Sequence, residues 1–147
     1  MVDKFAGDAI MATFNVSGQS VDHALQALKA AIAIIDKAAL AGLPVGADLA
    51  VGPVVVGNLA ESANVSVLGD VTNLASRLQA QSGAGEVTMS DEAFRRSKDW
   101  IEVQHIPVER LEVDLKGFSE PVVVFRLAAS VPCEAPTRVG AEGRKAT

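Results

Sequence analysis

The feature that most constrains the fold is a long amphipathic segment at residues 21–39. Its apolar side chains recur at intervals of three and four residues, which places them on one face of a helix: Val21, Leu25, Leu28, Ile32, Ile35 and Ala39. Ser20 is the expected N-cap, and Gly42 and Pro44 end the segment. A helix with one apolar face has to cover another layer, so we expect a sheet for it to pack against.

Short strand-like runs surround this helix. Before it, VDKFAGDAIMATF at residues 2–14 has two apolar runs around a Gly-Asp pair, which predicts a tight β-hairpin. The Val54-Val55-Val56 run favours a central strand that is covered on both faces. Further strands are expected at residues 45–51, 53–58, 65–68, 86–89, 100–105, 108–115 and 121–127, and further helices at 70–80 and 91–98.

This order of elements predicts an α/β (α+β) sandwich with helices on one face of a mostly antiparallel sheet. A hairpin, a helix, a second strand pair, a second helix and closing strands are like part of a ferredoxin-type arrangement. Such an arrangement normally begins with a strand and a helix ahead of the hairpin. We expect a folded domain over residues 1–128 and a frayed tail over residues 129–147, where small and polar residues dominate.

Charge and composition exclude several classes of function. The 147 residues carry a formal net charge of -5, which argues against wrapping a nucleic-acid backbone. With no Tyr and one Trp, the chain also has no stacking surface for single-stranded RNA. The most apolar helical stretch, residues 30–35, is too short to span a bilayer. The single cysteine, Cys133, fits a reducing compartment, so we expect a cytoplasmic protein or the cytosolic part of a longer one.

Two polar side chains share one side of the second expected helix. Asn73 and Arg77 are four residues apart and therefore project one turn above the other. An amide and a planar, permanently charged guanidinium together suit sugar oxygens and phosphate. The four-residue spacing of Asn73 and Arg77 is explained at least as well by an ordinary solvent-exposed helix face with no ligand.

The expected hairpin places two charges near its tip. Asp8 is a hard oxygen donor of the kind that Mg²⁺ or Mn²⁺ uses when a triphosphate supplies further ligands, although an Asp also simply favours a turn. Lys4 can pair with Asp8, bind a ligand or point into water. His23 and His105 lack partners at metal-ligand spacing, so we interpret both as surface or structural histidines.

Four segments in unbroken order resemble class III adenylate and guanylate cyclases. The hairpin is similar to the family pattern K-F-x-G-D-x-x-M-A-x-F, and AVGPVVVGN at residues 50–58 is similar to T-G-x-V-V-x-G-N. Residues 67–94 resemble G-D-x-V-N-x-A-x-R-L followed by G-x-x-x-x-S, and LKGFSEPVVVFRL at residues 115–127 resembles the usual L-K-G-x-x-x-P-V-x-x-Y-x-L ending. The resemblance implies the class III nucleotide cyclase fold.

The resemblance also implies a role for each matching residue. Asp8 matches one of two metal-binding aspartates, and Lys4 matches the lysine that donates to adenine N1. Ser66 falls where adenylate cyclases usually have Asp or Thr, and it keeps a hydroxyl that can accept from the adenine amino group. Asn73 matches the residue that orients the ribose, and Arg77 the one that stabilises charge on the α-phosphate.

The implied reaction converts ATP into 3′,5′-cyclic AMP and pyrophosphate. Two Mg²⁺ or Mn²⁺ ions per site and ATP as the substrate follow from the resemblance, and Lys116 resembles the lysine near the terminal phosphates. The family's site lies between two subunits, so the resemblance implies a homodimer or pairing with a related cyclase domain. Guanylate cyclases typically carry Glu and Cys where this chain has Lys4 and Ser66, which favours ATP over GTP.

The chain departs from the family pattern in three places. Only three residues precede Lys4, so the family's opening strand with the other metal-binding Asp is expected to be absent. The loop at residues 60–66 is short and lacks a basic residue, and Val65 stands where Tyr is common. These departures keep a second hypothesis open, in which the chain is a non-catalytic cyclase-homology module that acts through dimerisation or nucleotide binding.

Overall fold

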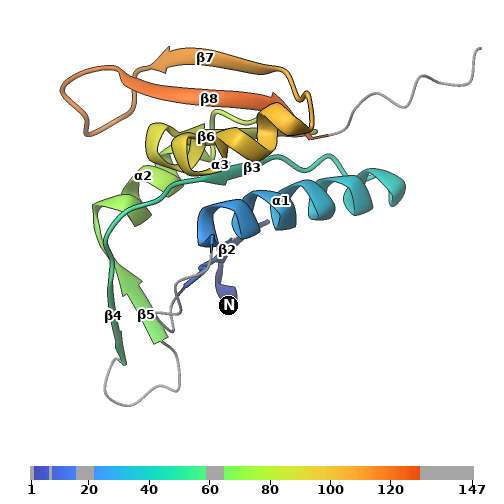
Figure 1. Ribbon diagram of the computed structural model, residues 1–147. Helices are drawn as coiled ribbons and strands as arrows, with labels where there is room; N and C mark the ends of the chain where they lie inside the picture. The colour runs from blue at the N-terminus through green and yellow to red at the C-terminus, as the bar shows by residue number, and fades with distance from the viewer. Residues whose placement is uncertain (1, 7, 16–21, 59–64, 130–147) are drawn as a thin grey trace, which may run out of the picture.

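Three helices and eight strands make up the part of the chain that the computed structural model describes, residues 2–6, 8–15, 22–58 and 65–129. Figure 1 shows their arrangement. In chain order they are β1 (Val2–Ala6), β2 (Ala9–Ala12), α1 (His23–Leu40), β3 (Ala47–Leu49), β4 (Val55–Asn58), β5 (Val65–Leu68), α2 (Asp70–Leu78), β6 (Glu86–Ser90), α3 (Asp91–Val103), β7 (Val108–Val113) and β8 (Val122–Ala128).

A four-stranded sheet in the order β3-β6-β8-β7 forms the centre of the molecule (Figure 1). Strands β3 and β6 are parallel, and β8 pairs antiparallel with both β6 and β7. The predicted α+β class with a mostly antiparallel sheet is therefore confirmed. The parallel pair arises because β4, β5 and α2 lie between β3 and β6 in the chain and return it to the same end of the sheet.

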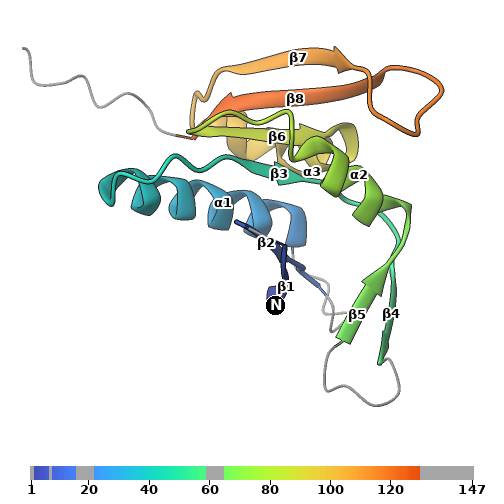
Figure 2. The same cartoon turned by 180° about the vertical axis from the view of Figure 1, so that it is seen from behind.

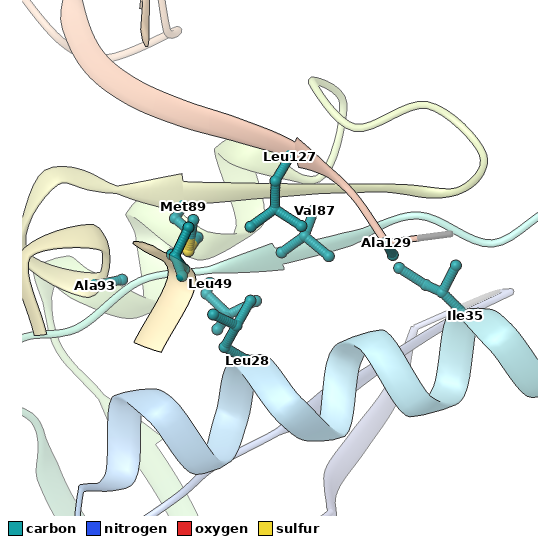
Figure 3. Packing of buried hydrophobic residues seen from close by; sticks show 9 residues of the cluster. Leu28, Ile35, Leu49, Val87, Met89, Ala93, Leu127 and Ala129 are labelled. Atoms are coloured by element: carbon teal, nitrogen blue, oxygen red, sulfur yellow. The ribbon is translucent and has the colours of Figure 1, made fainter. Parts of the chain in front are cut away.

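Helices α1 and α3 cover one face of this sheet and enclose the main core. The apolar face predicted for the first long helix supplies Leu28 and Ile35, which point toward the sheet (Figure 3). Side chains on alternate positions of the strands meet them, because successive residues of a strand face opposite sides. The buried members of this core are Leu28, Ile35, Leu49, Val87, Met89, Ala93, Ile101, Leu127 and Ala129.

Helix α2 packs on the opposite face, so the expectation that all helices share one face is wrong for α2. Seen from behind, α2 lies in front of the sheet and α3 lies beyond it (Figure 2). Its buried Leu78 forms a second cluster with Val124 and Leu115, and Leu74 packs against that cluster. Val124 alternates along β8 with Phe125 and Leu127 of the main core, so the two clusters lie on different sides of the sheet.

Two antiparallel ribbons lie outside the four-stranded sheet. The predicted hairpin is present as β1–β2, in which Phe5 is opposite Ile10, and β4 pairs with β5. The expectation that the valine run is a central strand covered on both faces is wrong. Within the described residues, β4 pairs only with β5, and Val55 keeps 71% of its surface exposed.

Two helix boundaries also differ from the prediction. Helix α3 continues to Val103, so the strand expected at residues 100–105 is wrong: Ala93, Ser97 and Ile101 recur at four-residue spacing and form one buried helix face. That burial overrides the β-propensity of Trp100, Ile101 and Val103. Helix α1 begins at His23 with Asp22 as its N-cap rather than at the predicted Ser20, which lies outside the described residues.

At the other end of the chain, Ala129 is the first residue of the predicted tail and is buried in the main core. The remainder of that tail lies outside the described residues. Among the helices of the described residues, none has the length and apolar character needed to cross a membrane.

Candidate active site

The start of α2 is held tightly against the segment that leads into β4. Gly69 joins β5 to α2, and a Cβ at this position would lie 2.9 Å from the carbonyl oxygen of Pro53. A Cβ on Gly52 would likewise lie 3.2 Å from the Cβ of Val71, in the first turn of α2. Thr72 Oγ1 donates to the Gly69 carbonyl oxygen within the first turn. These close contacts fix where the helix begins, and therefore where its polar side chains lie.

Asn73 and Arg77 both lie on the exposed side of α2, one turn apart as predicted. Leu74 and Leu78 follow them directly in the chain and pack on the sheet, so the two polar side chains are turned away from the core. Neither side chain forms a hydrogen bond or ion pair with another residue that the structure describes. The amide and the guanidinium are therefore available to a ligand.

The structure brings the loop that carries Lys116 next to the same helix. Leu115 is buried in one cluster with Leu78, so this part of the β7–β8 connection lies beside the C-terminal half of α2. Lys116 itself is exposed and forms no ion pair with the described residues. Arg77 and Lys116 therefore lie on neighbouring elements, and two cations there favour an anionic ligand.

The strands that carry the two predicted base-reading residues are in contact. Lys4 lies on β1 and Ser66 on β5, where Ser66 is opposite Gly57, and β1 packs against β5. The side chains of Lys4 and Ser66 lie outside what the structure describes. The loop expected to lack a basic residue is also largely outside the described residues, which resume at Val65.

Asp8 lies at the exposed turn of the β1–β2 hairpin. Its carboxylate oxygens are suitable ligands for Mg²⁺ or Mn²⁺, which commonly bind one or two carboxylates together with the phosphates of a substrate. No group of three or more potential protein ligands gathers within the described part of the chain. Asp8 therefore fits a metal that is held jointly with a triphosphate, and it does not form a closed protein site.

A surface hollow of about 500 Å³ lies beside the start of α3 and is also lined by Leu74 of α2. Its lining includes Leu74, Asp91, Arg95 and Arg110, and none of the six predicted site residues. The charged residues that line it already form ion pairs: Asp91 pairs with Arg95, and Arg110 pairs with Glu112, which lies outside the lining. The predicted site is thus an exposed surface of α2 and its neighbours rather than this hollow.

The sequence did not reveal a polar network behind α2. Ser82, four residues after the end of the helix, lies within hydrogen-bond distance of Asp48 on β3 and Thr88 on β6. Arg126 on β8 donates to the carbonyl oxygen of Gln81. Burial raises the pKa of Asp48 to about 6, while a hydrogen bond that Ser82 donates to the ionised carboxylate and the charge of Arg126 oppose that rise. No spacing pattern marks these residues, because only the pairing of β3, β6 and β8 brings them together.

The fold is that of a nucleotide cyclase domain. The chain belongs to the adenylate and guanylate cyclase catalytic domain family, whose model matches residues 4–129. The predicted membership is thereby confirmed, and it assigns the chain to a family of cyclases without fixing the nucleotide.

Mycobacterial proteins are among the relatives in sequence. An adenylate cyclase of Mycobacterium tuberculosis is 27% identical over 150 residues, which cover 97% of this chain and 33% of that protein. An uncharacterized protein of the same species, Rv2212, is 32% identical over 126 residues, which cover 84% of this chain and 29% of that protein. The chain therefore spans about a third of the length of these curated relatives.

Solved cyclase structures share the fold. The adenylyl cyclase CyaB from P. aeruginosa is 28% identical with a TM-score of 0.68, and the match covers 88% of this chain and 71% of that one. The catalytic core of a rhodopsin-guanylyl cyclase with converted specificity, in complex with ATPαS, is 25% identical with a TM-score of 0.71 and the same coverage. Adenylyl and guanylyl cyclases both occur among its structural neighbours, since the guanylyl cyclase Cya2 also shares the fold with a TM-score of 0.64.

Proposed function

We propose that this chain is the catalytic domain of an adenylate cyclase, which converts ATP into 3′,5′-cyclic AMP and pyrophosphate. The observation that carries the proposal is the exposed pair of Asn73 and Arg77, held on a helix that is anchored to the sheet. Contact between β1 and β5 supports it, because these strands carry Lys4 and Ser66. The adenylate cyclase among the mycobacterial relatives is further support.

In the proposed reaction the ribose 3′-hydroxyl releases its proton to solvent, its oxygen attacks the α-phosphorus to form a new P–O bond, and the bond to pyrophosphate breaks. Asn73 holds the ribose so that the 3′-oxygen faces the phosphorus, and Arg77 donates to the α-phosphate oxygens as their negative charge increases. Lys116 binds the terminal phosphates, on which the leaving charge collects. When bound at Asp8 with the triphosphate, Mg²⁺ or Mn²⁺ supplies further charge stabilisation and acidifies the ribose hydroxyl.

The test of this function is direct. The purified protein is incubated with Mn-ATP and, separately, with Mn-GTP, and the cyclic products are identified. We expect cyclic AMP from ATP and little product from GTP. Cyclic GMP as the main product would overturn the choice of ATP, and no cyclic nucleotide from either substrate would overturn the catalytic role.

Base selection is assigned to Lys4 and Ser66. Lys4 donates to adenine N1, which is an acceptor in adenine but carries a hydrogen in guanine, and Ser66 Oγ accepts from the adenine amino group. A Lys4→Glu and Ser66→Cys double variant should shift kcat/KM from ATP toward GTP, since a buried mismatch of donors and acceptors is costly. An unchanged ratio of the two kcat/KM values would remove both residues from base recognition.

We further propose that the active form is a homodimer in which Asp8 of one subunit serves the site that uses Lys4, Asn73 and Arg77 of the other. Mixing inactive Asp8→Ala and Arg77→Ala subunits should then restore activity, because each mixed dimer regains one intact site. Random mixing predicts about a quarter of the wild-type rate. The matched control mixes Asn73→Ala with Arg77→Ala, which belong to one set and should restore none. Equal rates in the two mixtures would contradict the shared site.

A second candidate is a non-catalytic cyclase-homology module that binds a nucleotide or pairs with another cyclase domain. The small number of metal ligands favours it: Asp8 is the one predicted metal ligand, whereas the proposed reaction uses two metal ions. No group of three or more protein ligands gathers in the described residues. This candidate predicts saturable ATP binding without turnover. Turnover by the purified chain excludes it. We propose a cytoplasmic location for either form, which the single cysteine supports.

A further inference from the structure

A cluster of oxygen atoms ties the end of α2 to the sheet. Ser82 Oγ lies 2.6 Å from Asp48 Oδ1, 2.7 Å from Thr88 Oγ1 and 2.8 Å from the carbonyl oxygen of Ala47. Asp48 and Thr88 are opposite each other in the parallel β3–β6 pair, and Thr88 is fully buried. The cluster lies on the α2 side of the sheet, and Ser82 follows Arg77 by five residues.

The number of hydrogens in this cluster depends on the charge of Asp48. Three oxygen–oxygen contacts at hydrogen-bond distance need three hydrogens, and the carbonyl of Ala47 can only accept. Ser82 and Thr88 bring one hydroxyl hydrogen each. The third hydrogen has to come from Asp48, so all three contacts are hydrogen bonds only when the carboxyl is protonated. Ser82 then donates to Ala47 and accepts from both Asp48 and Thr88.

The charged groups around Asp48 come from the two neighbouring strands. Arg126 on β8 attracts the ionised carboxyl, but its Nη2 donates to the Gln81 carbonyl oxygen at 2.7 Å, and its Nε lies 3.5 Å from Glu86 Oε2 on β6. The Arg126 charge is thus partly engaged by Glu86, which limits what it contributes to Asp48. Burial is the larger effect and raises the pKa of Asp48 to about 6.

We propose that Asp48 is a positioning residue whose protonated form completes a latch with Ser82 and Thr88, and that this latch fixes the C-terminal end of α2 and the adjacent Arg77. Loss of the proton leaves one oxygen–oxygen contact without a hydrogen and loosens that end. The effect on catalysis rests on the proposed cyclase function, whereas the latch itself does not.

The sign of the pH dependence follows from the two states. The folded protein holds the Asp48 proton more tightly than the unfolded chain, in which the pKa of this carboxyl is 3.8. Stability from the latch is therefore present at low pH and is lost as the pH rises from about 4 through about 6. Asp48→Asn carries an amide that donates at every pH, so this variant should keep the latch closed.

The first arm of the test measures urea unfolding of the wild type and Asp48→Asn between pH 4.5 and 7.5. The unfolding constant of the wild type should rise relative to that of the variant by on the order of tenfold over this range. Asp99→Asn makes the same exchange at an exposed carboxyl on α3. The ratio of the wild-type unfolding constant to that of Asp99→Asn should therefore stay constant over this range. Parallel curves for wild type and Asp48→Asn would overturn the latch.

The second arm reads the position of α2. Hydrogen-exchange protection of the Gln79 and Gln81 amides, which donate to Ala75 and Leu78, should fall above pH 6 in the wild type and stay constant in Asp48→Asn. If Asp48→Asn does not fold, NMR titration of the wild-type Asp48 carboxyl carbon replaces it. A Ser82 amide that fails to shift together with that carbon would overturn the latch.

The third arm concerns the reaction. The ratio of kcat for Asp48→Asn to kcat for the wild type should rise by more than twofold between pH 5.5 and 8, with KM for ATP unchanged. A constant ratio would remove the effect on Arg77. If neither protein makes a cyclic nucleotide, the proposed function fails, and the first two arms still decide the latch.

Discussion

The two faces of the central sheet are filled in opposite ways. Against α1 and α3 the sheet presents a continuous apolar core, in which Leu28, Val87, Met89 and Leu127 are at most 2% exposed. Against α2 it presents a small apolar cluster and, beside it, the polar network of Asp48, Thr88 and Arg126. The first face supplies stability, and the second positions an exposed helix whose contacts depend on hydrogen bonds. Asn73 and Arg77 lie on the helix that covers this second face.

The largest stability effect should come from the α1 face. Leu28→Ala removes a fully buried side chain from the main core and should lower the free energy of unfolding by about 2–5 kcal/mol. Val55→Ala, at an exposed position of β4, should change it by less than about 0.5 kcal/mol. Urea unfolding of both variants measures the difference. Similar losses would mean that the β4–β5 ribbon is as well packed as the core.

An intermediate effect should come from the close approach that fixes the start of α2. Gly69→Ala places a Cβ against the backbone oxygen of Pro53 and should cost about 1–3 kcal/mol. It should also lower the cyclase rate, because the start of the helix has to move. Gly57→Ala, in β4, meets open space and serves as the matched control. Unfolding midpoints that are equal for the two variants would show that α2 is not held at Gly69.

The smallest effect should come from the cap of α3. Ser90 Oγ accepts from the Ala93 amide at 3.3 Å and from the Val51 amide at 3.4 Å, which joins the helix to the end of β3. Ser90→Ala should lower the free energy of unfolding by about 1 kcal/mol, and Ser90→Thr should keep most of it. A Ser90→Ala protein with unchanged stability would assign no energy to this cap.

Local patterns predicted the fold where burial and periodicity agree. Leu28, Ile32 and Ile35 of the predicted apolar face pack in the main core, whereas Ala39 is exposed. The predicted hairpin is present as the antiparallel pair β1–β2. They failed where tertiary contacts decide: Trp100 to Val103 favour a strand locally but continue a buried helix face. The valine run of β4 has the composition of a strand that is covered on both faces. In the described structure, however, β4 pairs only with β5 in a two-stranded ribbon.

The family motifs predicted more residues of the candidate site than helix spacing alone did. The four-residue spacing of Asn73 and Arg77 correctly predicts a shared helix face. Helix α2 packs against the cluster that contains Leu115, so it lies near the loop that carries Lys116. This proximity depends on the order of the strands in the sheet, and the spacing of residues in the sequence does not predict it. The same holds for Asp48 and Ser82, which are 34 residues apart and meet only in the folded sheet.

The most direct test of the central claim measures rate and stability on one preparation of Arg77→Ala. Because Arg77 is exposed and forms no ion pair or hydrogen bond with the described residues, its removal should leave the urea midpoint unchanged. Loss of its charge should lower kcat for cyclic AMP formation by on the order of 100-fold or more. Arg96→Ala, at an exposed arginine on α3, should change neither quantity. An unchanged rate in Arg77→Ala, or a rate that falls only together with the midpoint, would contradict the account.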